Sequence, residues 1–314
     1  MVSMKKTKKN KPWLFFGLLA VLLAAPNATF IKVAGDVNPF LFNALRFGVV
    51  AIITSPLLLI HLSRFSKQNA KNAIIGSVFL ATASITFVLA VQYSQASYVP
   101  LIGLLTPINF MLLSAKMTGE RIKKKAVLGV LIAAIGMLLV VVLPIALHQQ
   151  GDLRLYPLAT ALALLDTICF PLALIYFKKA NEGGVPMSAL MNLASWLVVV
   201  IGMLLFKITS SGDMQLSAVA IATAVYSGVA VLLIARSLNV VTYEHIGSAV
   251  VGALDYLEKL LAILIPVVIL HETLSVEMVL GGALILCGVY MAEHHKVNTH
   301  KQHHFMKVAR WTSR

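Results

Sequence analysis

GERIKKKAVLG, residues 119–129, recurs as HETLSVEMVLG, residues 271–281. The glutamate, the Val-Leu-Gly run and a further glycine seven residues on, Gly136 and Gly288, match at one constant offset of 152 residues. Glycines seven residues apart share one face of a helix and allow two helices to approach closely in lipid. Five positions in register indicate an internal repeat of the chain.

The composition places this repeat in a membrane. Of the 314 residues, 59% are hydrophobic and 12% are charged, whereas soluble domains are roughly 25% charged. Apolar runs recur along the chain, each about the 20 residues that cross a bilayer as a helix. The formal net charge is +14, but the charges lie between apolar runs instead of on one polar face, which argues against nucleic-acid binding.

The apolar runs predict an all-α polytopic membrane protein with ten transmembrane helices, arranged as two inverted five-helix repeats. Because five is odd, the second repeat enters the membrane from the opposite side, as in many secondary transporters. The predicted spans are 13–31, 40–61, 73–93, 99–115, 126–147, 156–177, 186–206, 216–235, 246–270 and 276–292. The predicted organisation is a basic cytoplasmic N-terminus (1–12), a first repeat (13–147), an external linker (148–155), a second repeat (156–292) and a His/Lys-rich cytoplasmic tail (293–314).

Basic residues set the expected orientation. With a cytoplasmic N-terminus, 21 of the 26 Lys and Arg residues lie inside, Arg236 among them, and only Lys32, Arg154 and Lys207 lie outside. This asymmetry favours cytoplasmic termini and an even number of spans. The expected location is the plasma membrane of a bacterium, with an organelle membrane as the alternative. The run from Trp13 to Ala25 also resembles a cleavable signal peptide, which would leave nine spans.

The chain resembles the drug/metabolite transporter superfamily, with two EamA-type halves. The likeness rests on Pro26-Asn27, Arg46-Phe47 and the two Glu and Leu-Gly segments, and it extends over nearly the whole chain. It departs from the family pattern at Lys259, which stands where the first half has Pro107. The resemblance implies a central cavity lined by the first, third, fourth, sixth, eighth and ninth spans, rocking between inward-open and outward-open states, and transport of amino acids or other small metabolites.

Five ionisable residues fall inside the predicted spans: Arg46, Asp166, Asp255, Glu258 and Lys259. Charges at bilayer depth are costly and are functional candidates by default. Two cations against three acids leave one excess negative charge, which protonation or a bound cation would remove. We therefore expect one of the acids to exchange a proton or to bind a substrate amino group, with Arg46 or Lys259 receiving a carboxylate. Alternatively, these charges pair with one another and only hold neighbouring helices together.

Three uncharged residues complete the candidate site. Asn27, after Pro26, and Asn109, after Pro107, mark either unwound helix with carbonyls free for substrate or hydrogen-bonded kinks, and Tyr256 lies beside Asp255. Glu120 and Glu272 are expected to stabilise the starts of the fifth and tenth spans. Cys169 and Cys287 are expected to be packing residues.

The predicted function is therefore secondary active transport, probable export, of small metabolites such as amino acids or amines by alternating access, with proton coupling as an option. The expected partners are a small-molecule substrate and the lipid bilayer, with no nucleic acid, and a homodimer is left open. No cofactor, metal site or enzymatic activity is expected, although the five histidines of the tail raise metal binding there as an alternative. The rival classes are a lipid-modifying membrane enzyme and a membrane scaffold.

Overall fold

The computed structural model describes residues 11–118, 123–146, 156–210, 216–245 and 248–294. Over these residues the fold is helical, with no strand. The first half contains α1 (Lys11–Ala24), α2 (Asn27–Val33), α3 (Pro39–Ile60), η1 (Leu62–Arg64), α4 (Lys67–Tyr93), α5 (Tyr98–Gly103), α6 (Thr106–Thr118) and α7 (Lys124–Ala146). The second half contains α8 (Tyr156–Glu182), α9 (Met187–Thr209), α10 (Ala218–Tyr226), the π-helix η2 (Ser227–Ala235), α11 (Arg236–His245), α12 (Ser248–Ile269) and α13 (Val276–His294).

Taken together along the chain, these helices correspond to the ten predicted spans: α1 and α2 form the first, α5 and α6 the fourth, and α10, η2 and α11 the eighth. Among the described residues, eight segments are long and apolar enough to cross a membrane. The ninth, α12, has sufficient length but carries Asp255, Glu258 and Lys259, and the tenth is the shorter apolar helix Val276–Ala292 within α13. The predicted fold class is confirmed. The predicted linker (148–155) and the predicted tail from residue 295 onward lie outside the described residues.

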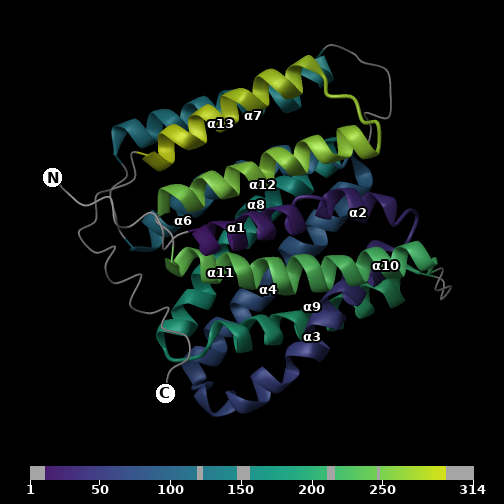
Figure 1. Ribbon diagram of the computed structural model, residues 1–314, viewed down its shortest axis with the longest axis vertical. Helices are drawn as coiled ribbons and strands as arrows, with labels where there is room; N and C mark the ends of the chain where they lie inside the picture. Colours follow the sequence, from purple (N-terminus) through teal and green to yellow (C-terminus); the bar gives the residue numbers. More distant parts are fainter. Residues whose placement is uncertain (1–10, 119–122, 147–155, 211–215, 246–247, 295–314) are drawn as a thin grey trace.

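The paired glycines bring α7 and α13 together at one edge of the bundle (Figure 1). A Cβ on Gly129 would lie 2.5 Å from the carbonyl oxygen of Gly288, and one on Gly136 would lie 2.6 Å from that of Gly281. Residue numbers rise along one helix as they fall along the other, so α7 and α13 are antiparallel. Equivalent helices of the two repeats therefore run in opposite directions, as inverted repeats require.

A second antiparallel pair, α3 and α9, lies at the opposite edge (Figure 1). The fully buried Asn192 of α9 donates to the carbonyl oxygen of Ala51 at 2.8 Å and to Thr54 Oγ1 at 2.7 Å, both on α3. Trp196 donates to Ser55 one turn further on. Hydrogen bonds hold such contacts where lipid supplies little hydrophobic drive between helices.

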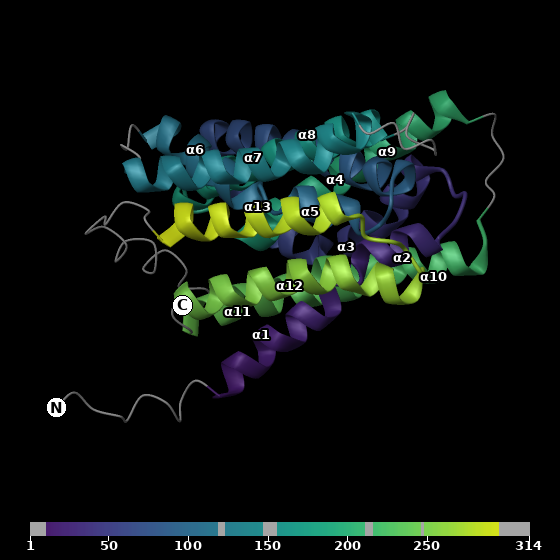
Figure 2. The same ribbon diagram turned by 90° about the horizontal axis from the view of Figure 1, so that it is seen from above.

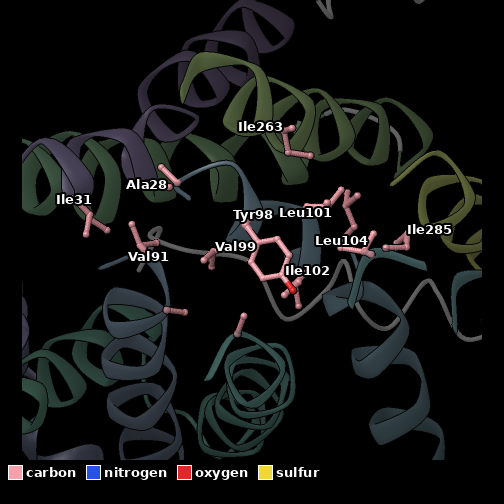
Figure 3. Packing of buried hydrophobic residues seen from close by; sticks show 14 of the residues in the cluster. Ala28, Ile31, Val91, Tyr98, Val99, Leu101, Ile102, Leu104, Ile263 and Ile285 are labelled. Atoms are coloured by element: carbon pink, nitrogen blue, oxygen red, sulfur yellow. The ribbon is translucent and has the colours of Figure 1, made fainter. Parts of the chain in front are cut away.

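The short helix α5 lies at the centre of the largest buried cluster. Tyr98, Leu101 and Ile102 of α5 lie among Ile31, Val91, Ile263 and Ile285, which come from α2, α4, α12 and α13 (Figure 3). The Tyr98 hydroxyl is hydrogen-bonded to Thr160 of α8 at 2.7 Å. Elements from both halves thus share one core.

The end of the eighth span was predicted wrongly. The sequence prediction stopped it at Ala235, but the helix continues without a break through η2 and α11 to His245. The apolar stretch of this segment extends over Ala218–Thr242, so Arg236 lies within this continuous helix and not in a loop. Glycine and proline are absent between Gly228 and Gly247, and this absence was the signal for a longer helix.

Two half-buried charged side chains, Lys32 and Glu272, are hydrogen-bonded to loops at one end of the bundle. Lys32 donates to the carbonyl oxygens of Gln92 at 2.9 Å and Ser94 at 2.8 Å, where α4 ends. The carboxylate of Glu272 accepts hydrogen bonds from the residues that precede α5. The structural role expected of Glu272 is confirmed, but it serves the start of α5 and not the start of its own span, whereas Glu120 lies outside the described residues.

Candidate functional site

The first span is interrupted where Pro26-Asn27 predicted a break. Helix α1 ends at Ala24 and α2 begins at Asn27, because Pro26 has no N–H with which to continue the ladder. The hydroxyl of Tyr226 donates to the carbonyl oxygen of Leu23 at 2.9 Å, and Ser227 donates to Asn27 Oδ1 at 2.7 Å. Asn27 thus forms a hydrogen-bonded kink against a neighbouring helix, one of the two predicted alternatives.

The fourth span is also interrupted, between α5 and α6. Asn109 of α6 donates to the backbone carbonyl of Thr167 at 3.2 Å and to Thr167 Oγ1 at 2.9 Å. These bonds fix α6 against the turn of α8 that carries Asp166. Asn109 therefore positions this turn, which again matches the hydrogen-bonded alternative.

Arg46 lies deep in the bundle. Its side chain is 3% exposed, and its guanidinium carbon lies 5.4 Å from the ring centre of Phe47. Within the described part of the chain, its Nε and Nη1 atoms have no hydrogen-bond partner. Buried polar atoms are nearly always paired, so these two nitrogens are exceptional.

Charges from three other helices act on Asp166 of α8. The cations that act on its carboxylate are, in decreasing order, Lys259 of α12, Arg236 of α11 and Arg46 of α3. Arg236 is also the charge that acts most strongly on Arg46, ahead of Asp166. We call Asp166, Arg46, Arg236 and Lys259 the interior charge cluster; Arg46 is buried, Asp166 and Lys259 are half-buried, and Arg236 is exposed. Three cations surround one acid in it.

Arg236 is the member of this cluster that the sequence prediction missed. Its guanidinium carbon lies 5.6 Å from the ring centre of Phe170, one turn beyond Asp166 on α8. It follows directly after η2, a run of π-helix, and π-helical turns occur frequently at functional sites. Counting Arg236 adds a third cation to the charges in the apolar helices, and the expected excess of one negative charge stays a prediction.

The remaining predicted residues lie on α12. Glu258, Lys259 and Tyr256 are half-buried, whereas Asp255 is exposed. Tyr256 packs against the largest buried cluster. Helix α12 contacts α1, α2, α5 and α11, and it lies on the opposite side of the bundle from α8 (Figure 2). Lys259 therefore reaches the cluster from the side opposite Asp166, while a pairing of Asp255 with Lys259 stays a prediction.

No metal centre is formed within the residues that the structure describes, since no group of three or more His, Cys, Asp or Glu side chains is placed to hold an ion. The histidines from His295 onward lie outside them. Cys169 is buried and Cys287 is exposed, and neither forms a disulfide. The interior charge cluster is thus the candidate site of the described chain.

The antiparallel repeats, the interrupted spans and the interior charges define a class: polytopic α-helical membrane transporters of small solutes. The model of the EamA-like transporter family matches residues 11–142 and 157–293. The chain belongs to the EamA-like transporter family.

Solved structures support the fold. One similar crystal structure has a TM-score of 0.59 over 90% of this chain and 96% of that chain, at 18% sequence identity. At this identity the likeness concerns the fold alone. The search of curated proteins gives no match.

Proposed function

We propose that this protein is a secondary active transporter that exports small metabolites, such as amino acids or amines, from a bacterium by alternating access. The observation that carries the proposal is the interior charge cluster, in which Arg46 of the first repeat meets Asp166, Arg236 and Lys259 of the second. Substrate sites of inverted-repeat transporters lie near the midplane, at the interface of the repeats. A charge cluster that joins the repeats changes its spacing when they rock.

Proton coupling is the second part of the proposal. Asp166 is the carboxylate of the cluster, and a proton on it would change the local charge at the point where both repeats meet. Asp255 and Glu258 are the other carboxylates within the spans. One of the three would then load and release a proton during each transport cycle.

The test is transport by purified protein in proteoliposomes, supplied with a mixed pool of labelled amino acids and amines, with and without an imposed proton gradient. Wild type is compared with Asp166→Asn, Asp255→Asn and Glu258→Gln. We expect transport that depends on the gradient and falls at least about tenfold in Asp166→Asn, as expected when an essential proton carrier is removed. Glu182→Gln, at the exposed end of α8, is the matched control.

Each alternative result has its own meaning. Gradient-dependent transport that falls in Asp255→Asn or Glu258→Gln alone would move the coupling role to α12. Transport that is equal with and without the proton gradient would exclude proton coupling. The protein would still be a transporter. No movement of any solute in the pool would contradict the proposed transport of amino acids and amines and would favour the enzyme or scaffold alternatives.

A further inference from the structure

Arg46 is a buried charged residue whose guanidinium, within the part of the chain that the structure describes, lacks hydrogen-bond partners at two of its nitrogens. Its side chain is 3% exposed, and two of its three guanidinium nitrogens, Nε and Nη1, lack a hydrogen-bond partner among the described residues. Removing one partner from a buried charge is strongly destabilising, because the charge then has neither water nor a counter-ion. A guanidinium in this state requires an anion during part of its working cycle.

Asp166 does not supply enough negative charge for the cluster. Arg236 and Asp166 are the charged groups that act on Arg46, the first by repulsion and the second by attraction, and Lys259 is among the cations that act on Asp166. Arg46 and Arg236 against one carboxylate, that of Asp166, leave a local excess of one positive charge beside Arg46. In a low-dielectric interior such an excess favours binding of an anion.

Each of the two arginines, Arg46 and Arg236, lies close to an aromatic ring. The guanidinium carbon of Arg46 lies 5.4 Å from the Phe47 ring centre, and that of Arg236 lies 5.6 Å from the Phe170 ring centre. Cation–π contacts leave the edge nitrogens of a guanidinium free to donate. A planar fork of donors matches the two oxygens of a carboxylate.

The geometry points to Arg46 as the anchor of an anion-binding site, completed by Arg236 and Lys259, that receives the carboxylate of a small organic substrate. Asp166 is the tethered counter-ion that the substrate carboxylate displaces from the cations on entry. This inference rests on the proposed transport function and narrows it: the transported solute carries a carboxylate, as amino acids and organic acids do, and a simple amine without one is not a substrate.

The test measures binding without requiring transport. Purified protein in detergent is titrated with acetate, succinate, glycine or inorganic phosphate at constant ionic strength in chloride, and with the diamine putrescine, while Tm is followed. We expect saturable rises in Tm with carboxylates and none with putrescine. In Arg46→Gln the half-saturating concentration should rise at least about tenfold, the loss of a charge-assisted pair. Arg46→Lys should lose part of this affinity, since it keeps the charge but not the fork.

The matched control is Arg64→Gln, which removes an exposed arginine of η1 and should leave the titrations unchanged. Arg236→Gln and Lys259→Gln should each weaken carboxylate binding. If Arg46→Gln does not fold, the titrations of these two variants test the anion site instead. The inference is overturned if no carboxylate raises Tm, if Arg46→Gln or both other variants bind as wild type does, or if phosphate alone binds.

Failure of the inference and failure of the proposed function are separable. Carboxylate binding without flux of any solute in proteoliposomes would uphold the anion site and reject transport. Flux of amines that no carboxylate inhibits would uphold transport and reject the anion site.

Discussion

Glu272 is hydrogen-bonded to Ser97 through both the backbone and the side chain. Its carboxylate accepts the Ser97 N–H at 2.9 Å, the Ser97 hydroxyl at 2.7 Å and the neighbouring Ala96 N–H at 2.6 Å. The bonds tie the segment between α12 and α13 to the start of α5. Ser97 and Glu272 are 175 residues apart in the sequence. Their contact therefore joins the two repeats at one end of the bundle.

Replacing Glu272 should weaken this joint. Glu272→Ala leaves the buried Ser97 and the two N–H groups without their acceptor, a loss of about 2–3 kcal/mol. We expect a lower Tm in detergent and faster proteolysis of the loop before α5. Asp36→Asn, which removes an exposed carboxylate, should leave both unchanged. Equal Tm values for the two variants would show that the hydrogen bonds contribute nothing to stability.

The glycine contact between α7 and α13 should not tolerate a side chain. A Cβ on Gly136 would lie 2.6 Å from the Gly281 carbonyl oxygen and 2.8 Å from the Ile285 nitrogen, and both are backbone atoms. Gly136→Ala should therefore force the helices apart at a cost of about 1–3 kcal/mol. Gly103→Ala is the control, because a Cβ there meets nothing within 4 Å. Thermal unfolding of both variants checks the prediction, which fails if Gly136→Ala matches wild type.

The bond between Ser227 and Asn27 should stabilise the kinked first span. Ser227 is fully buried, and Ser227→Ala leaves the Asn27 side-chain oxygen without its 2.7 Å donor, a loss of about 1 kcal/mol. Ser195→Ala is matched to it, since Ser195 is also buried but bonds only to Met191 of its own helix. Hydrogen–deuterium exchange around the break at Pro26 should rise in Ser227→Ala and not in Ser195→Ala. The reverse order would contradict a role for this bond.

Lys32 should stabilise the end of α4. Its ammonium group donates to three backbone carbonyl oxygens, those of Val91, Gln92 and Ser94, at 2.8 to 3.4 Å. Lys32→Met removes these donors and should cost about 1–3 kcal/mol in unfolding measurements. Lys207→Met, at the exposed end of α9, should cost less than about 0.5 kcal/mol. An equal loss in both variants would indicate an effect of net charge alone.

Loops at the two ends of α3 should face opposite sides of the membrane. The expected orientation places Asp36, before α3, outside and Gln68, after it, in the cytoplasm. With Cys169 and Cys287 replaced by serine, Asp36→Cys should react with a membrane-impermeant maleimide in intact cells, and Gln68→Cys only after permeabilisation. Both side chains are exposed, so the reactivity reports sidedness. The opposite labelling pattern would invert the predicted topology.

The sequence predicted the architecture because two periodic signals are local. Apolar runs of span length identify helices without knowledge of their neighbours, and the offset between Gly136 and Gly288 gave the repeat and its inversion. The glycine spacing also predicted close packing, which the contact of Gly129 with Gly288 confirms. The prediction of where the eighth span ends was wrong, because hydropathy alone assigns Arg236 and the polar residues after it to a loop.

The candidate site depended on tertiary structure. The sequence by itself determined that the protein is a two-repeat helical membrane protein with charges inside its spans, since hydrophobic length and repeat spacing are properties of the chain. Only the tertiary structure decided that Arg46, Arg236 and Lys259 all act on Asp166, that Asn27 and Asn109 are hydrogen-bonded to neighbouring helices, and that Asp255 is exposed. Which charges become neighbours depends on how distant helices pack, and packing through small residues and hydrogen bonds leaves little trace in hydropathy.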